Sequence, residues 1–516
     1  MLPFLLDTGL LNFKGHYKEL SKGYYYIETV VLLLAFMYLC RIKNPEQLAQ
    51  ISPGEFGKLL GLDRSPGAKC LRKKLKEICA QQKSTEWNMG LAREWSQEEG
   101  NDFYYIDGHV QVYHGHKATL GKKHVSRQKL CLPGIQEFWV NNGQGQPYFY
   151  VTGQVNEKLQ EVISGQIVPE LLDKLNNEQQ TLDTPRFTIV FDREAYSPQF
   201  FGQLWQDHQI AVLTYRKNVK DQWEESCFKK YTINVESTEV EMALAEKQLI
   251  LDGVEMREVR KLSKDGHQTS VITTHPLLST ALIALYMFAR WSQENFFRYM
   301  RQDYDFDKIG QYTVDQIDDM FEVVNPAHNK VEYKIRKIRE KIARRKARIY
   351  TLIEAYSGQD IDQTPSYLAK VEKQQQELKA LLNEEQDLIE QRKNTQHRIK
   401  IKDMGENRYN KLDMESKLFR NIIKMICYRA ETSFATLLSA NYKKAINEKR
   451  ALAKKVINAS ADLTVDMEKQ TLQVSLYSLP NPRDNQALSE ICQTLNEMEI
   501  IFPGTKLQMI YDIATK

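Results

Sequence analysis

The sequence predicts a mixed α/β fold divided among several domains. Two observations support this prediction. The chain contains 516 residues, whereas a single hydrophobic core rarely grows beyond about 250–300 residues. Between residues 100 and 310, short apolar runs rich in β-branched and aromatic residues alternate with helix-forming segments. This alternation is typical of strands and helices that share one domain.

The composition limits the class of protein. The net charge of +4 is only mildly basic, so the local distribution of charge must identify any polyanionic partner. None of the seven cysteines forms a C-x-x-C pair, which argues against a disulfide framework or a zinc ribbon and favours a reducing compartment. The apolar run at residues 30–40 is shorter than the roughly 20 residues that span a bilayer. We therefore expect a buried helix there, no membrane association and a cytoplasmic protein.

Residues 1–95 are expected to form a helical region that resembles a helix-turn-helix unit. Three helix starts follow one another, each a capping residue followed by proline: Asn44–Pro45, Ser52–Pro53 and Ser65–Pro66. The third helix is basic, with the cations Lys69, Arg72, Lys73, Lys74 and Lys76. Such a helix could lie in the major groove of DNA, with Arg72 and Lys73 as contacts. The alternative is a charged helix face in solvent.

Residues 96–325 are expected to form the central α/β domain. Its strand signals are "DFYYIDGHVQVYHG", "PYFYVTGQV" and the buried run "FTIVF" at residues 187–191. Short strands and turns between about residues 211 and 275 predict a β-rich insertion. The apolar segment at residues 277–301 predicts one long helix.

Residues 326–410 predict a coiled-coil hairpin. Apolar residues recur at alternating spacings of four and three on either side of a polar turn at residues 357–366: Val331, Ile335, Ile338, Ile342, Ile349 and Leu352, then Leu368, Val371, Leu378, Leu382 and Ile389. The first arm is strongly basic and the second is richer in glutamate and glutamine, so the arms should pair with each other. Contact of the basic arm with DNA stays open. Residues 411–516 predict a small C-terminal α/β domain.

Three acids are candidates for a catalytic centre. Asp107 lies in the first strand of the central domain, Asp192 follows the buried run, and Glu294 lies in the long helix. Acids from strands and a helix can converge on divalent cations, and Mg²⁺ prefers oxygen ligands. Two ions about 3.5–4 Å apart can activate the attacking oxygen and stabilise the leaving oxygen of a phosphodiester. We expect two Mg²⁺ ions, for which Mn²⁺ could substitute.

Basic residues near these acids are candidate contacts for DNA phosphates. Arg290 lies four residues before Glu294 and Arg301 seven residues after it, so the three should share a helix face. An ordinary ion pair between Arg290 and Glu294 is the alternative. A basic loop follows the first strand, and its candidate contacts are Lys122, Lys123 and Arg127.

Four neighbouring residues have less defined roles. Glu194 is expected to point away from Asp192 as a surface or supporting group, and Arg193 fits either a phosphate contact or a structural ion pair. His109 should lie on the same strand face as Asp107, as a supporting group. Trp291 is expected to pack in the core, with stacking on an unpaired base as the alternative.

The blocks around the three acids resemble those of a known enzyme family. "IDGHVQVYHG", "FDREAYSP" and "RWSQENFFRYMR" are similar to the three blocks of bacterial insertion-sequence transposases of the DDE type. The third block resembles the Y-x2-R-x3-E-x6-K signature of one group of these enzymes. Here it reads Tyr286-x3-Arg290-x3-Glu294-x6-Arg301, so the tyrosine is one residue further out and arginine replaces lysine. The resemblance covers roughly residues 100–310.

The resemblance implies an RNase H-like catalytic core in which Asp107, Asp192 and Glu294 hold the metal ions. The implied activity is DNA cleavage followed by strand transfer of a mobile element. The implied partners are double-stranded DNA, at the element ends and the target, and a second copy of the chain in a homodimer. The implied location is the nucleoid of a bacterial cytoplasm. Two alternatives remain: a repurposed DNA-binding relative without catalysis, and a metal-dependent nuclease without strand transfer.

Overall fold

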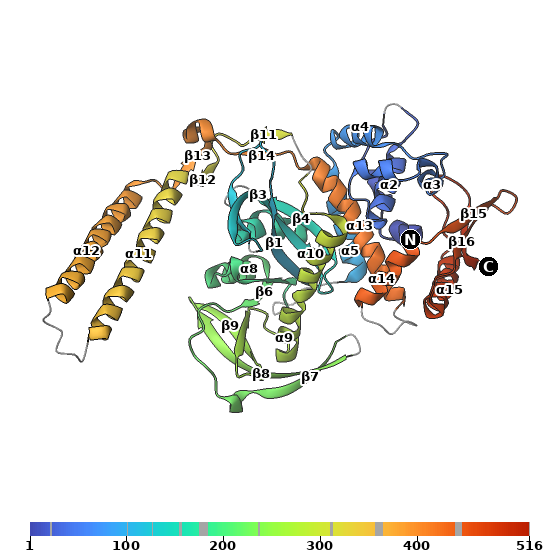
Figure 1. Ribbon diagram of the computed structural model, residues 1–516. Helices are drawn as coiled ribbons and strands as arrows, with labels where there is room; N and C mark the ends of the chain where they lie inside the picture. Colours follow the sequence, from blue (N-terminus) through green and yellow to red (C-terminus); the bar gives the residue numbers. More distant parts are fainter. Residues whose placement is uncertain are drawn as a thin grey trace. The chain divides into compact units, whose positions relative to one another are not determined.

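The computed structural model describes residues 1–20, 23–100, 102–125, 127–153, 157–174, 184–235, 238–309, 313–356, 365–438 and 446–514. The chain divides into two compact units. The first comprises residues 1–113, 123–312 and 413–516, and the second comprises residues 114–122 and 313–412. Figure 1 labels the helices and strands as they are named below. The finer division at residues 95, 325 and 410 stays a prediction.

A mixed sheet forms the centre of the first unit (Figure 1). Its strand order among the described residues is β2-β3-β1-β5-β6-β10-β9-β8-β7, with β4 also paired to β3. The strands are β1 Phe103–Val112, β2 Lys122–Val125, β3 Leu130–Asn141, β4 Pro147–Gly153, β5 Phe187–Phe191, β6 Ile210–Tyr215, β7 Lys229–Val235, β8 Thr238–Leu251, β9 Val254–Leu262 and β10 Gln268–Thr273. β1, β3 and β4 pair antiparallel, whereas β1, β5 and β6 run parallel. The predicted mixed α/β class is confirmed.

The predicted β-rich insertion continues this sheet. Strands β7 to β10 form an antiparallel series, and β10 pairs antiparallel with β6. The sequence pattern had grouped β6 with the insertion, but β6 pairs parallel with β5 in a buried register from Phe187↔Ile210 to Phe191↔Thr214. Since five buried residues of β6 pack on both faces, it belongs to the central strands.

Short helices precede the sheet. They are α1 Leu2–Asp7, η1 Asn12–Gly15, α2 Ile27–Leu39, η2 Pro45–Gln50, α3 Pro53–Lys58, α4 Ala68–Cys79 and α5 Ser84–Glu99. The buried helix expected at residues 30–40 is α2, and no described helix is long and apolar enough to cross a bilayer. Asn44 caps η2 as predicted. Helix α4 begins later than predicted, at Ala68, because Gly67 has an extended backbone conformation and occupies the capping position in place of Ser65. The Ser65 N–H donates to the Pro53 carbonyl at 2.9 Å.

The helices that follow the first strands are α6 Leu159–Val162, η3 Ile163–Ile167, α7 Val168–Lys174, η4 Arg193–Ala195, α8 Pro198–His208, η5 Glu225–Cys227, α9 Thr280–Ala289 and α10 Trp291–Tyr304. The prediction of one long helix was therefore wrong, because α9 and α10 are separated at Arg290. The Arg290 N–H donates to the Phe288 carbonyl instead of that of Tyr286, four residues earlier. The Tyr286 carbonyl accepts from the Tyr105 hydroxyl at 2.8 Å, which replaces the missing helical bond.

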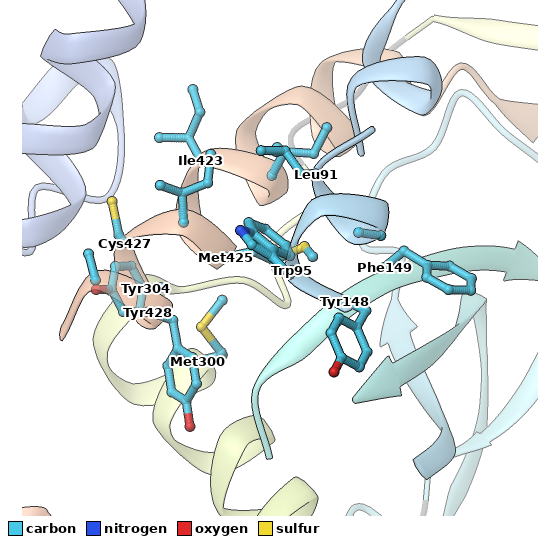
Figure 2. Close-up of a cluster of buried hydrophobic side chains, with 14 of the residues drawn as sticks. Leu91, Trp95, Tyr148, Phe149, Met300, Tyr304, Ile423, Met425, Cys427 and Tyr428 are labelled. Atoms are coloured by element: carbon cyan, nitrogen blue, oxygen red, sulfur yellow. The ribbon is translucent and has the colours of Figure 1, made fainter. Parts of the chain in front are cut away.

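The C-terminal segment completes the core of the first unit. Helix α13 (Glu415–Leu437) is buried over most of its length and packs against α1, α2, α4 and α5. Figure 2 shows side chains of α13 (Ile423, Met425, Cys427 and Tyr428) among those of α5, β4 and α10. One hydrophobic cluster extends from Leu2 to Tyr511. The two ends of the sequence therefore share one core with the central sheet.

A buried ion pair also joins α13 to the sheet. The Lys417 ammonium lies 3.0 Å from Oε1 of Glu137 on β3, and both side chains are almost fully buried. The Gln111 amide and the Trp139 indole donate to the other oxygen of Glu137. Losing one partner of such a pair costs about 3–5 kcal/mol, because the remaining charge is buried and unpaired.

The rest of the C-terminal segment forms α14 Ile446–Ile457, β15 Ala461–Asp466, β16 Thr471–Tyr477, α15 Pro482–Glu497 and β17 Gln508–Ala514. β15 and β16 form an antiparallel hairpin, and β17 runs parallel to β16. Helix α15 packs against β17.

The second unit is a helical hairpin on two short strand pairs. Its elements are β11 Val314–Gln316, β12 Glu322–Val324, α11 Pro326–Tyr356, α12 Pro365–Asn394, β13 Arg398–Lys400, η6 Ile401–Asn407 and β14 Asn410–Leu412. The two long helices lie side by side (Figure 1). They are antiparallel, since the ion pairs Glu332–Arg392, Arg339–Glu385 and Arg345–Glu377 ascend one arm and descend the other. The predicted charge pairing of the arms is confirmed, and the turn at residues 357–364 lies outside the described residues.

Candidate active site

The sheet brings two of the candidate acids together. In the parallel pairing of β1 with β5, Ile106 lies opposite Phe191. Asp107 and Asp192 are the next residues on these neighbouring strands, which are about 4.8 Å apart in a sheet. The Asp192 carboxylate accepts from the Arg193 N–H at 2.7 Å and begins the short helix η4. Its direction is thereby fixed at the end of β5.

Arg290 brings the third acid into the group. Its guanidinium nitrogens lie 3.8 Å from Oδ2 of Asp107, 3.7 Å from Oδ2 of Asp192 and 3.2 Å from Oε1 of Glu294. The Arg290 side chain is 12% exposed, whereas the Asp192 and Glu294 side chains are about half exposed. Three acids far apart in the sequence therefore converge on one cation at the break between α9 and α10.

The electrostatics of the group favour a cation among the acids. The pKa of Asp107 is raised to about 6, chiefly by burial. Arg290 and the Gly108 N–H lower this pKa, whereas the charges of Glu194 and Asp192 contribute to raising it. Neighbouring carboxylates repel one another and hold protons unless a cation neutralises them. Within the described residues, no group of three or more Asp, Glu, His or Cys side chains is arranged to hold a metal ion. The Arg290 guanidinium lies among the three carboxylates instead.

Comparison with known proteins identifies the family. A family model described as "Transposase protein" matches residues 1–515. The chain belongs to this transposase family. Transposases cut and join DNA, so a member of this family would act on DNA. No curated protein and no solved structure matches the transposase.

Gln293 anchors the helix that carries Glu294, a role that the sequence pattern did not predict. This fully buried side chain donates to the Tyr105 carbonyl at 3.1 Å, the Trp139 carbonyl at 3.2 Å and Oδ1 of Asn141 at 2.9 Å. It thereby fixes α10 to β1 and β3. The signal in the sequence was a polar residue in helical phase with the buried Phe296, Phe297 and Met300.

A second polar group lies beside the acids of the transposase. His109 is buried between the rings of Phe297 and Phe306, and its Nε2 lies 2.6 Å from Oδ1 of Asp307. Arg127 donates to the other oxygen of Asp307 at 3.0 Å. Burial would raise the pKa of Asp307, but the hydrogen bonds and charges of His109 and Arg127 hold it below its usual value. The Arg127 side chain is therefore exposed and is also held by its ion pair with Asp307.

The other predicted DNA contacts are dispersed. Arg301 lies near Arg127 and Asp307, where burial and the neighbouring arginines lower its pKa, and within the described residues no ion pair links it to Glu294. Arg193 is exposed and lies 5.7 Å from the centre of the Tyr215 ring. On α4, Lys73 is exposed and Arg72 forms an ion pair with Glu46 at 3.1 Å. On β2, Lys122 is exposed, whereas Lys123 is partly buried with a pKa lowered by burial.

Two expectations about neighbouring side chains were wrong. Trp291 is 63% exposed at the start of α10 instead of packed in the core, because the helix break at Arg290 changes the phase of the residues that follow. Glu194 is exposed, as expected of a surface or supporting group, but it does not point away from the acids. Its carboxylate accepts from the Gln136 amide at 3.3 Å, and a Cβ at Gly108 would lie 3.3 Å from Oε2. Glu194 therefore lies close to Asp107.

Proposed function

We propose that this transposase is of the DDE type, with Asp107, Asp192 and Glu294 as ligands of two Mg²⁺ ions, for which Mn²⁺ could substitute. The observation that carries the proposal is the convergence of these three carboxylates on the Arg290 guanidinium. Carboxylate oxygens are the ligands that Mg²⁺ prefers. Because a cation already neutralises the group, divalent ions that took its place would meet the same electrostatic need.

The sheet topology supports an RNase H-like core. Three antiparallel strands, β4, β3 and β1, are followed by the parallel strands β5 and β6. Asp107 lies on the central strand and Asp192 at the carboxyl end of its neighbour. Helix α10, held by Gln293, supplies Glu294 to the same group.

Each side chain then has a stated task in cleavage and strand transfer. Two bound metal ions would supply activation of the attacking oxygen and stabilisation of the leaving oxygen. The three carboxylates would hold these ions, and Gln293 would keep Glu294 in place. Arg290, once displaced from the acids, would pair with a DNA phosphate, because a guanidinium binds phosphate with two parallel hydrogen bonds. The exposed Trp291 ring beside it would stack on an unpaired base.

The test is a DNA cleavage and joining assay with the DNA that flanks the gene, in Mg²⁺. Glu294→Gln should abolish nicking and joining while DNA binding persists. Asp207→Asn, an equivalent acid-to-amide change at an exposed position of α8, should leave activity unchanged. Cut ends without joined products would identify a nuclease. Tight binding without cutting by the unmutated protein would identify a repurposed DNA-binding relative.

We further propose that the transposase acts as a homodimer on DNA, because two element ends must be cut in concert. Sedimentation of the protein with end DNA should yield a complex with two protein chains. A complex with one chain that still joins both ends would contradict this proposal.

A further inference from the structure

Helix α11 carries a second periodic pattern beside its apolar one. Cations recur at alternating spacings of four and three, at Lys330, Lys334, Lys337, Lys341, Arg344 and Arg348. Each lies one residue before a position of the heptad series that begins at Val331 and packs against α12. Residues spaced three and four apart lie on one side of a helix, so these six form a continuous row, here called the basic stripe. All six are exposed.

The pairing of the two arms leaves the basic stripe largely without counter-charge. The cations of α11 that pair with α12, Arg339 and Arg345, lie outside the stripe. Within the stripe, Glu340 contacts Lys337 at 3.0 Å and Arg344 at 4.0 Å. Among the described residues, no ion pair involves the other four stripe cations, Lys330, Lys334, Lys341 and Arg348.

The charge of α11 is more than its partner helix can neutralise. α11 has ten lysines and arginines and only three glutamates, whereas α12 has five cations and six acids. Like charges three and four residues apart destabilise a helix. Six in succession therefore oppose the fold of the isolated hairpin, and a polyanionic partner would remove this repulsion.

We propose that the basic stripe binds the phosphate backbone of double-stranded DNA. The inference rests on the proposed action on DNA but not on the catalytic acids. From Lys330 to Arg348 the stripe is about 27 Å long at 1.5 Å per residue, which equals about eight base pairs at 3.4 Å each. Glu377 and Glu384 of α12 line a groove with Lys341, Arg344 and Arg348, so the phosphates should contact the stripe on its solvent side.

Binding by the stripe should be independent of DNA sequence. Lysine and arginine contacts to phosphates fix position and supply affinity, whereas sequence is read by contacts to base edges in the grooves. An exposed row of long, flexible cations presents charge along a line, as a duplex backbone does. The stripe would therefore hold DNA beside any site that other parts of the transposase recognise.

The test compares two triple variants of the full-length protein. Lys330, Lys334 and Lys341 are changed to Gln in the stripe variant, and Lys370, Lys373 and Lys379 of α12 are changed to Gln in the control. All six lysines are exposed, and the change in charge is equal. Helicity by circular dichroism should match the parent in both variants, because no packing contact is removed. The thermal midpoint should not fall in the stripe variant, since the change relieves repulsion between like charges.

The readout is the affinity for a duplex of arbitrary sequence, measured by fluorescence anisotropy over a range of salt concentrations. Each lost phosphate contact lowers the salt slope of log K by about 0.9, so the stripe variant should lose about 2–3 in slope. The salt slope of the control variant should fall by less than about 0.9. Duplexes that contain the element ends should show the same difference between the two variants. Equal slopes in both variants, or an unchanged slope in the stripe variant, would overturn the proposal and favour an acidic protein as the partner.

The catalytic proposal fails or succeeds in a different assay. Glu294→Gln should keep the parent's affinity and salt slope while losing cleavage. The stripe variant should retain the ability to cut DNA at low salt, where the remaining contacts suffice. If the unmutated protein does not cut DNA, only the catalytic proposal is contradicted. If the salt slope of the stripe variant is unchanged, only the proposal about the basic stripe is contradicted.

Discussion

The Gln293→Leu substitution tests whether α10 is held in register by one buried amide. Leucine has a similar volume, so packing is conserved while the hydrogen bonds to Tyr105, Trp139 and Asn141 are removed. Two N–H donors are lost, and Oε1 of Gln293 has no partner to lose. Since each buried polar group left unpaired costs about 1–3 kcal/mol, the loss of two donors should lower the free energy of unfolding by about 2–6 kcal/mol.

The same substitution should also reduce DNA cleavage. The neighbouring Glu294 depends on Gln293 for its position over β1, and a misplacement of about 1 Å at a reacting group can lower a rate by about 10²-fold. Urea unfolding would measure the first effect, and single-turnover cleavage in Mg²⁺ well below the unfolding midpoint would measure the second. Gln302→Leu, at an exposed position of the same helix, is the matched control. Unchanged stability and cleavage in Gln293→Leu would refute the anchoring role.

Three further predictions concern single residues. Asp192→Cys should abolish cleavage with Mg²⁺ and restore part of it with Mn²⁺, because a thiolate is a poor ligand for Mg²⁺, the harder ion. If Mn²⁺ restores no cleavage in the assay, the result would count against Asp192 as a metal ligand. Trp291→Ala should change the thermal midpoint little, since the ring is 63% exposed. The same change should weaken binding to DNA with an unpaired base by about 1–3 kcal/mol, and equal affinities of parent and variant would exclude stacking. Asp307→Asn should destabilise the protein at neutral pH, and in urea titrations the difference in stability from the parent should shrink below about pH 4. The reason is that a carboxyl group with a lowered pKa stabilises the fold above its unfolded pKa, and this stability is lost as the pH falls through the folded pKa. A stability difference that does not change with pH would contradict the ion pairs of Asp307.

Local patterns predicted the elements that carry the acids. The strand predicted at residues 187–191 has the same first and last residue as β5, because five apolar residues between turn signals have few alternatives to a buried strand. The strand that holds Asp107 and the two arms of the hairpin were predicted for the same kind of reason. In each case the signal lies within about one element length of the residue concerned.

Contacts between residues that are distant in the chain could not be predicted from the sequence pattern. The helix break at Arg290 depends on a hydroxyl from Tyr105, which is remote in the chain. The phase change at that break exposes Trp291, and the short helix after Asp192 returns Glu194 towards Asp107. The convergence of the acids on Arg290 likewise requires the parallel pairing of β1 with β5, which composition and periodicity do not specify.

The late position of α13 in the chain affects how the transposase is made. At about 5–20 residues per second, a ribosome needs about 20 to 80 seconds to reach residue 413, and only then can α13 cover α2 and α5. During this time the apolar faces of the earlier segments lack their final partner, and exposed apolar surface of this kind favours aggregation. A message cut short before α13 should therefore yield an aggregating product, and not a soluble fragment that competes with the intact protein for DNA.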